Sequence, residues 1–337
     1  MDTHTENSLL LRFAGFREIG IFIFLILVVI VISIRSPVFL TLDNLYDIAL
    51  DSAILAIVAI GEMMVILTGG IDISLGSGIG LSGMIVALII MNHWGIPPLI
   101  AVFMGTAIGT LLGAINGVLI VKGKIPPVIT TLGTMSLFRG ANFIINYAIT
   151  QGQWVSADKF SMPFKAFARG TFLFIPNLPL ITIIVYAIFY YFLNHTMTGR
   201  KIYAVGGNPE GAKFVGINVN KIIFLPYLFT GMLVGTGGVL WVSRYTSAQT
   251  DSAMGFEFMA ITAVVLGGVN IAGGAGSIVG VLFGSLLIGV INNALNLVRI
   301  SPFWKLAING LIILLAVIVD KIISRRMNEV LLARRKV

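Results

Sequence analysis

The sequence predicts an all-α integral membrane protein, on the combined grounds of its composition, its few charges and its long apolar stretches. Of 337 residues, 57% are hydrophobic and 11% are charged, and the mean hydropathy is +1.00. Soluble domains are roughly 25% charged, so a soluble fold could not hide this much apolar surface. At about 20 residues per crossing, the chain has room for roughly ten spans and for no large soluble catalytic domain.

Ten apolar stretches follow one another along the chain. The first could imitate a signal peptide, but it ends at Arg35-Ser36-Pro37 without a small-residue cleavage site. The stretch 258–271 is too short for an ordinary span, which favours a broken or re-entrant helix there. The predicted spans are residues 19–34, 48–68, 72–91, 97–121, 126–148, 176–194, 222–243, 258–271, 276–298 and 303–320.

The basic residues orient these spans. With ten crossings and a cytoplasmic N-terminus, more than twice as many Lys and Arg fall on the cytoplasmic side as on the outer side. This is the positive-inside tendency, and it accounts for most of the net charge of +8 without nucleic-acid binding. If 258–271 did not cross, the basic tail 321–337 would face outward. We therefore count it as a crossing and expect both termini in the cytoplasm.

The most polar internal stretch is the predicted cytoplasmic loop 195–221. Within it, Asn208 is a good N-cap and Pro209 suits the first helical position. Glu210 favours the positive end of a helix, and Gly216 can stop one. We expect a short helix of about two turns at the inner membrane surface, either as a docking element or as an ordinary capped loop helix.

Two segments of the chain echo each other. Residues 69–78 (Gly-Gly-Ile-Asp-Ile-Ser-Leu-Gly-Ser-Gly) match residues 267–276 at a constant offset of 198, with five identities in ten. Membrane transporters are often built from repeated halves. Because glycine is so common in this chain, chance similarity is the rival explanation.

Glycines also recur every four residues in two of the predicted spans. At that spacing each set forms one stripe along a helix, where missing side chains let a second helix approach closely. We expect tight packing, within the chain rather than for a dedicated dimer contact. The stripes are Gly105, Gly109, Gly113 and Gly117, and then Gly276, Gly280 and Gly284.

Three ionisable residues lie deep in predicted spans: Glu62, Asp72 and Arg139. Placing such a group at the centre of a membrane helix costs roughly 2.5–3.5 kcal/mol for Asp or Arg, so each needs a reason. Glu62 and Arg139 could form a buried pair, and Asp72 follows a Gly-Gly break where helix ends leave backbone groups free. A direct role in transport or proton relay is the alternative.

Uncharged polar side chains in the spans offer a candidate translocation path. Hydroxyl and amide groups suit a polyol better than an ion, and they also suit hydrogen bonding between helices. The candidates are Asn116, Thr131, Thr134, Asn142, Asn292 and Asn296.

Searches for catalytic motifs find none. The Gly123-Lys124 step is followed by Ile125, and Val118 stands where a phosphate-binding loop needs its first Gly. The three His residues are far apart in the sequence and there is no Cys to assist a metal site. We expect no catalytic residue, no metal and no cofactor bound by this chain, which should not hydrolyse ATP.

Four stretches carry a family resemblance. They are 69–77, 125–134 (Ile-Pro-Pro-Val-Ile-Thr-Thr-Leu-Gly-Thr) with Arg139-Gly140, 199–217 with Ala-Val-Gly-Gly-Asn-Pro-Glu-Gly-Ala-Lys at its centre, and 260–277. In this order, over nearly the whole chain, they resemble permease subunits of bacterial ABC importers for sugars. That class serves ribose, galactose, xylose, arabinose and rhamnose, and it includes permeases for the sugar-derived signal autoinducer-2.

The resemblance implies a type II ABC importer-like permease with a single polytopic domain, 1–337, in the bacterial inner membrane. It implies a second permease subunit, identical or related, two cytoplasmic ATPase subunits that bind ATP and Mg, and a periplasmic or lipoprotein sugar-binding protein. It makes 195–221 a coupling loop whose short helix docks into the ATPase. Gly211 departs from the family, which often has Ala or Ser there, and glycine weakens a short helix. The coupling residues would be Asn208, Pro209, Glu210, Ala212, Lys213 and Gly216.

Three other functions remain open at this point. A proton-coupled secondary carrier could use Glu62, Asp72 and Arg139 as its relay. A branched-chain amino-acid ABC permease would have a similar architecture, although the motifs at 69–77 and 199–217 favour sugars. A membrane scaffold without transport would purify without any ATPase.

Overall fold

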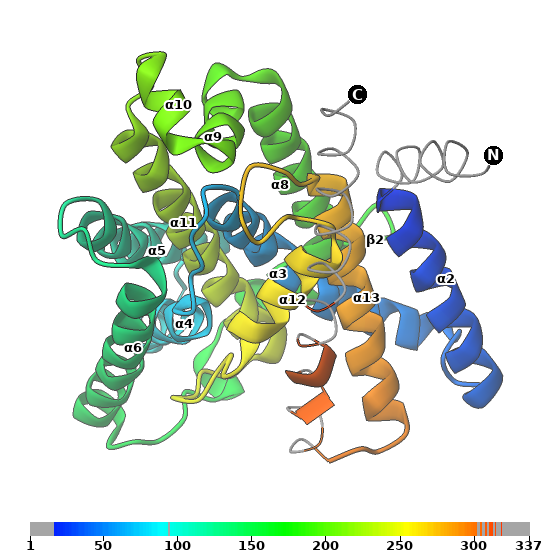
Figure 1. Cartoon of the computed structure of the whole chain (residues 1–337). Coiled ribbons are helices and arrows are strands. Elements are labelled where there is room, and N and C mark those ends of the chain that lie inside the picture. The colour runs from blue at the N-terminus through cyan, green and yellow to red at the C-terminus, as the bar shows by residue number, and fades with distance from the viewer. Residues whose placement is uncertain are drawn as a thin grey trace, which may run out of the picture.

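The computed structural model describes residues 17–93 and 95–301 and scattered positions between 304 and 318. The expected tail 321–337 lies outside the described residues, as does most of the expected span 303–320. The described chain is a helical bundle (Figure 1). Its long helices are α2 (Arg17–Arg35), α3 (Leu42–Leu67), α4 (Leu75–Asn92), α5 (Pro98–Val121), α6 (Pro127–Thr150), α8 (Asn177–His195), α11 (Val219–Tyr245) and α13 (Ile278–Leu297).

Among the described residues, seven helices are long and apolar enough to cross a membrane, namely all those above except α2. The apolar part of α2 and the helix α12 (Phe256–Leu266) are shorter apolar helices. The all-α membrane fold is therefore present.

Two predicted boundaries are wrong. Helix α3 begins at Leu42, six residues before the predicted start, because Asp43 suits its first turn and Asn44 is satisfied inside it. The amide of Asn44 donates to the carbonyl of Phe39 at 2.8 Å and to the side chain of Asn293 at 3.1 Å. At the other end, residues 69–74 form turns rather than the start of the next span, and α4 begins at Leu75.

The doubtful stretch 258–271 forms a short helix followed by turns. Helix α12 ends at Leu266, and Gly268 adopts a left-handed φ of 83° just beyond it. Eleven residues at 1.5 Å each reach only about 16 Å, half of a bilayer core. Gly267 and Gly268 directly follow the last residue of the helix, as expected for a broken helix.

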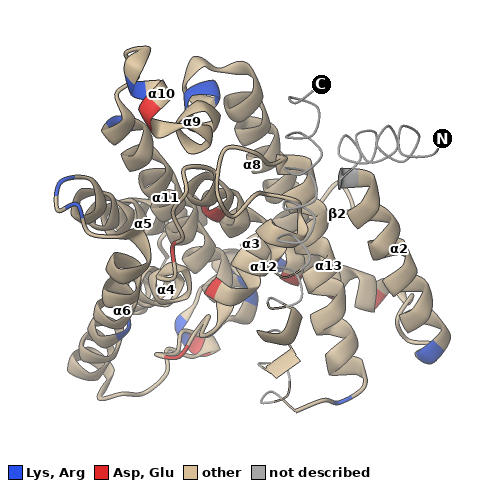
Figure 2. Ribbon diagram, in the orientation of Figure 1, with Lys and Arg blue, Asp and Glu red and all other residues tan. Residues whose placement is uncertain are grey.

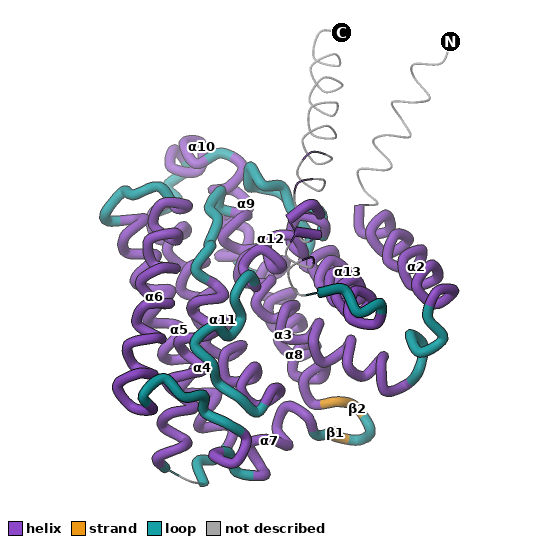
Figure 3. The backbone as a smooth tube through the Cα atoms, turned by 90° about the horizontal axis from the view of Figure 1, so that it is seen from below, coloured by secondary structure: helices purple, strands orange, loops and turns teal. Residues whose placement is uncertain are grey.

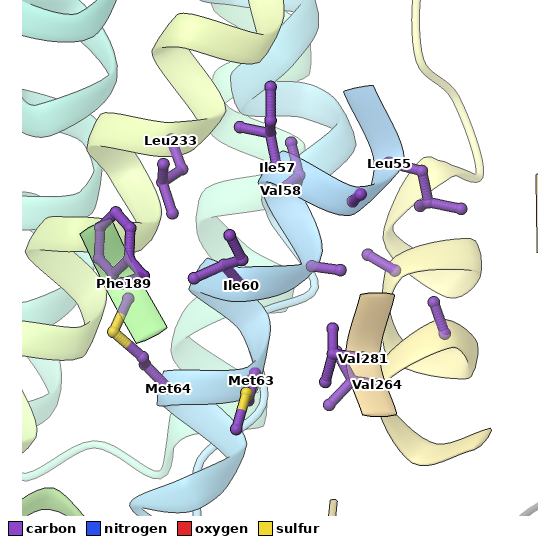
Figure 4. Close-up of a cluster of buried hydrophobic side chains, with 14 of the residues drawn as sticks. Leu55, Ile57, Val58, Ile60, Met63, Met64, Phe189, Leu233, Val264 and Val281 are labelled. Atoms are coloured by element: carbon purple, nitrogen blue, oxygen red, sulfur yellow. The ribbon is translucent and has the colours of Figure 1, made fainter. Parts of the chain in front are cut away.

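Helix α3 lies at the centre of the bundle, and its second half is buried on every side. Figure 4 shows Ile60, Met63 and Met64 of α3 among side chains from four other helices. A helix that is apolar all round is stable only where other helices surround it. The neighbours labelled there are Phe189 of α8, Leu233 of α11, Val264 of α12 and Val281 of α13.

The first glycine stripe lies against α11, where the two backbones touch. A Cβ added to Gly109 would stand 2.5 Å from the Cα of Gly235, and one added to Gly113 would stand 2.9 Å from the Cα of Gly231. Gly105 faces Gly235 as well, and Gly117 faces the ring of Phe224. The stripe therefore serves packing within this chain.

The second stripe joins α13 to α12. Added Cβ atoms at Gly280 and Gly284 would meet the carbonyl oxygens of Gly267 and Ala263, and one at Gly276 would meet Val269. Both stripes thus bring together helices that are neighbours in the bundle.

The loops between spans hold further short elements. Loop 195–221 contains two helices rather than one, α9 (Met197–Gly207) and α10 (Pro209–Phe214). Loop 149–175 contains the turn η1 (Ala157–Lys159) and the helix α7 (Met162–Arg169), and a hairpin of β1 (Thr171–Phe172) and β2 (Ile175–Pro176) follows. In Figure 3, α10 lies at one end of the bundle and α7 with the hairpin at the other.

Candidate functional site

Helix α10 is a short, rigidly capped projection. The side chain of Asn208 accepts a hydrogen bond from the N–H of Gly211 at 2.9 Å, and Pro209 occupies the first turn. Gly216 has a left-handed φ of 80°, which ends the helix. Glu210 and Lys213 are exposed, whereas Ala212 is buried against the rest of the chain.

Two large apolar side chains at the C-terminal end of α10 are exposed. Phe214 is 91% exposed and Val215 is 76% exposed. Sequence reasoning missed both, although a Phe in the most polar loop of the chain is itself a signal. An exposed aromatic residue beside a capped helix is typical of a protein-binding surface.

Basic side chains surround the same end of the bundle. Figure 2 places Lys and Arg on α9, on α10 and on the loop between α5 and α6. These positions include Lys122, Lys124, Arg200, Lys201 and Lys213. Their shared end agrees with the sequence-based assignment of these residues to one membrane face.

Helix α9 links α10 to the two glycine-rich segments. An added Cβ at Gly206 would meet the carbonyl oxygen of Leu67 and would stand 2.7 Å from the nitrogen of Gly274. The hydroxyl of Tyr203 donates to the carbonyl of Gly276 at 3.2 Å. Burial raises the pKa of the Tyr203 phenol, so it stays protonated and able to donate.

The two segments that echo each other have similar turns and touch. Asp72 accepts from the N–H of Ser74 at 2.8 Å, and Asn270 accepts from the N–H of Ala272 at 3.0 Å. Each is the same kind of side-chain turn, four or five residues after the end of a helix. This geometric likeness is what an internal repeat would produce.

Asp72 lies at the centre of a buried polar cluster. Its carboxylate also accepts from the hydroxyl of Ser74 at 2.6 Å and the amide of Asn116 at 3.3 Å. Its N–H donates to Glu62 at 3.2 Å, and the hydroxyl of Thr131 donates to the carbonyl of Ile71 at 3.2 Å. The cluster therefore holds the turn 69–74 between α3, α5 and α6.

The expected pair of Glu62 and Arg139 is wrong. Arg139 donates to the carbonyl oxygens of Thr250 at 3.1 Å and Ser252 at 2.8 Å, in the loop between α11 and α12. Glu62 lies in the Asp72 cluster instead, and no salt bridge joins these two described residues. Both charges thus satisfy backbone groups, which a sequence cannot reveal.

The six predicted path residues belong to three separate places. Asn116 and Thr131 lie in the Asp72 cluster, and Thr134 donates to the carbonyl of Thr131 at 3.3 Å. Asn142 joins Arg139 at the 250–252 loop, donating to Thr250 at 3.0 Å. The remaining two, Asn292 and Asn296, line a cavity at the far end of α11 from α10.

We call this cavity the outer cavity, because the sequence-based orientation would put it on the outer side, and its volume is about 730 Å³. Its walls come from α3, α11, α12, α13 and the loop 246–255, which are far apart in the sequence. Among the lining residues are Asp51, Trp241, Tyr245 and Gln249, none of which the sequence singled out. The spacing of Trp241 and Tyr245, one turn apart at the end of a span, is the signal that could have found it.

Comparisons with known proteins place the chain in a family. The model of the family described as "Branched-chain amino acid transport system / permease component" matches residues 44–317. The ribose import permease of Bacillus subtilis (strain 168) is 40% identical over 305 residues, covering 90% of this chain and 93% of the relative. The D-allose transport system permease of Escherichia coli (strain K12) is 36% identical over 305 residues, covering 90% and 91%.

Another relative is the ribose import permease of Escherichia coli (strain K12), 40% identical over 298 residues that cover 88% of this chain and 91% of the relative. No solved structure matches the chain significantly. The residues matched by the family model include α10 and both glycine-rich segments. The chain belongs to this family of membrane permeases, as a permease subunit of a sugar ABC importer.

Proposed function

We propose that this permease imports a monosaccharide with energy from a partner ATPase, and that α10 is the helix through which the ATPase acts. The capped α10 with Phe214 exposed at its end is the observation that carries the proposal. A short helix that is capped at both ends moves as a rigid unit. A displacement of the ATPase would therefore reach the membrane helices through it more fully than through a flexible loop. Glu210 and Lys213 offer polar rim contacts around the apolar Phe214.

The path from α10 into the membrane supports this role. Helix α9 follows the inner end of α8 and touches the carbonyl of Leu67 and the turn at Gly274. Leu67 is the last residue of α3, and Gly274 belongs to the glycine-rich segment that follows α12. A displacement of α10 would therefore reach both broken-helix segments through α9.

The names of the relatives suggest the substrate class. They include permeases for ribose, D-allose, galactose with methyl galactoside, and fructose. We propose a monosaccharide substrate and take D-ribose as the first probe. A branched-chain amino acid, such as leucine, is the comparison substrate, and autoinducer-2 is a further sugar-like probe.

The assembly we propose has three kinds of component. Two permease subunits, identical or related, would form the membrane part, and two ATPase subunits would bind ATP and Mg in the cytoplasm. A periplasmic or lipoprotein binding protein would deliver the sugar at the end of the bundle opposite α10. The chain would lie in the bacterial inner membrane with both termini in the cytoplasm and would hydrolyse no ATP itself.

The test compares two variants of the inner loop in the assembled importer. Phe214→Ala removes the exposed ring of α10, and Met197→Ala removes a side chain that is 63% exposed at the start of α9. We expect Phe214→Ala to lower sugar-stimulated ATP hydrolysis about tenfold and to weaken co-purification of the ATPase, since truncating a buried aromatic anchor costs 2 kcal/mol or more. Met197→Ala should change neither.

Replacing Asn208, Pro209 and Glu210 together by glycine should have the same effect as Phe214→Ala, because it unfolds α10. If both changes left sugar-stimulated hydrolysis at the wild-type rate, α10 would not be the coupling helix. Uptake of leucine but of no sugar would instead contradict the proposed substrate class.

A further inference from the structure

We infer that the outer cavity beside Trp241 and Asp51 is a binding site for a monosaccharide ring, occupied as the sugar enters the permease. The inference rests on the proposed function and names a site for its substrate. It assigns Trp241 as the wall against which the ring stacks. The hydroxyl partners are Asp51, Gln249, Asn292 and Asn296.

Three aromatic rings form the apolar wall. The centroid of the Trp241 ring lies 4.6 Å from that of Tyr245 and 5.5 Å from that of Phe256. The contact with Phe256 is edge to face. A pyranose or furanose has one face made of C–H groups, which loses little by leaving water and packs well against a large flat ring. Trp241 packs against both Tyr245 and Phe256, and these contacts restrict the indole in the absence of a ligand.

Polar side chains complete the lining. An amide offers two donors and an acceptor, and a carboxylate accepts only, so this set can satisfy hydroxyl groups that donate and accept. They reach the cavity from α3, α13 and the loop 246–255. An apolar wall with a few convergent polar groups is the usual make-up of a small-molecule site, and about 730 Å³ lies within the usual range of 300–1,000 Å³.

The carboxylates of the lining, Asp51 and Asp251, disfavour an anionic ligand and can accept hydrogen bonds from hydroxyl groups. The carboxylate of Asp51 lies 3.4 Å from the guanidinium of Arg244 and accepts from the hydroxyl of Tyr245 at 3.1 Å. Arg244 also bonds to Asp47 at 2.8 Å. Asp51 is thus oriented and partly neutralised, while 46% of its side chain stays exposed for a hydroxyl donor.

The place of the cavity suits entry of substrate. Helix α11 runs from Val219, beside α10, to Tyr245 in the cavity wall, a rise of about 40 Å for 27 residues. This separates the cavity from the proposed ATPase-docking helix by the full thickness of the bundle. The cavity therefore opens on the side where a binding protein would release its sugar.

The experiment measures sugar binding to the permease–ATPase complex in lipid nanodiscs, without the binding protein. Saturation-transfer NMR with D-ribose, D-allose, D-galactose and D-fructose reports which sugar protons contact protein. We expect signals mainly from C–H protons on one ring face. In Trp241→Ala and Gln249→Ala the dissociation constant should rise about tenfold or more.

Two further variants keep the test sharp. Trp154→Ala removes an indole that is 64% exposed in the loop 149–175 at the same end of the bundle, and it should bind sugar as the wild type does. Trp241→Phe keeps a smaller ring and should give intermediate affinity, so it decides the question if Trp241→Ala does not insert. Binding that is equal in the wild type, Trp241→Phe and Gln249→Ala would overturn the inference.

The outcome separates this site from the proposed function. ATP-driven sugar uptake by an importer that shows no Trp241-dependent binding would leave the function intact and overturn the site. Sugar binding that depends on Trp241, without ATP-driven uptake by the complete importer, would support the site and contradict the function. Absence of binding for all four sugars would also overturn the site.

Discussion

The N–H of Gly274 donates a hydrogen bond to the carbonyl oxygen of Leu67 at 2.9 Å. This bond joins the last residue of α3, two residues before the segment 69–78, to the segment 267–276 after α12. Gly206 of α9 packs on the same bond, so close that an added Cβ would meet both of its partners. The end of α3, the glycine-rich segment after α12 and the proposed coupling loop thus meet at one point.

Gly206→Ala should weaken the coupling between the sugar in the permease and ATP hydrolysis in the partner ATPase. The new methyl group would push α9 away from Leu67 and Gly274, although α10 would keep its cap and its exposed Phe214. We expect sugar-stimulated hydrolysis to fall about fivefold or more, which is a typical coupling energy of 1 kcal/mol or above. Co-purification of the ATPase should stay at the wild-type level.

The neighbouring glycine is the matched control for that change. A Cβ added to Gly207 would meet nothing within 4 Å, so Gly207→Ala should leave stimulated hydrolysis unchanged. Equal losses in the two variants would contradict the contact, because only Gly206 lies against Leu67.

Gly109→Ala should destabilise the bundle. The methyl group would stand 2.5 Å from the Cα of Gly235, and two helix backbones would have to separate. Overpacking of this kind costs about 1–3 kcal/mol. Thermal unfolding of the purified permease in detergent, followed by size-exclusion chromatography, should show a lower midpoint.

Gly140→Ala tests the same change where there is room. Gly140 lies inside α6 with nothing within 4 Å of an added Cβ, so alanine should raise the midpoint or leave it unchanged. A midpoint for Gly109→Ala at or above that of Gly140→Ala would show that α5 and α11 are not in contact.

Asp72→Ala should destabilise the permease more than Asp72→Asn does. Alanine leaves the N–H of Ser74 without its acceptor, at a cost of about 1–3 kcal/mol for a buried group, and the amide of Asn116 keeps only its bond to the hydroxyl of Ser74. Asparagine keeps an acceptor oxygen, as Asn270 does at the matching turn. The same thermal measurement ranks the variants, and equal losses would mean that the turn does not depend on this acceptor.

Exchanging Glu62 and Arg139 should give no rescue. Arg139 donates to two carbonyl groups of the loop 246–255. In Arg139→Glu the new carboxylate would face those oxygens, whichever residue stands at position 62. We expect the double variant Glu62→Arg with Arg139→Glu to yield no more monodisperse protein than the worse single variant.

The true ion pair at the outer rim is the control for this exchange. Asp47→Arg with Arg244→Asp restores a pair that stands 2.8 Å apart, and it should recover part of the loss of either single change. Rescue in the Glu62 and Arg139 double variant would contradict the contacts described for Arg139.

Features encoded by short stretches of chain could be predicted, whereas features that depend on helix rotation could not. Asn208, Pro209 and Gly216 define α10 within nine residues, because a cap acts on its own helix. The stripe on α5 was expected to pack, and its partner could have been found, since Gly231 and Gly235 have the same spacing of four. Helix α9 was missed because three of its eleven residues are glycine, a residue that sequence patterns assign to loops.

The site residues were harder to predict for a physical reason. A pairing such as Glu62 with Arg139 depends on how far each helix is turned and on which backbone groups lie nearer. The outer cavity is lined from four helices and one loop, so most of its lining residues are far apart in the sequence. The sequence points to Asn292 and Asn296 as candidate path residues, but not to Trp241 or Asp51.

The central claim is that this permease moves a sugar only when a partner ATPase drives it. The most direct measurement is uptake of D-ribose, D-allose, D-galactose or D-fructose into proteoliposomes that hold the complete importer, with binding protein outside and ATP inside. The account predicts uptake that requires ATP and stops without the ATPase subunits. Uptake driven by a proton gradient alone, with no ATP and no ATPase, would contradict it.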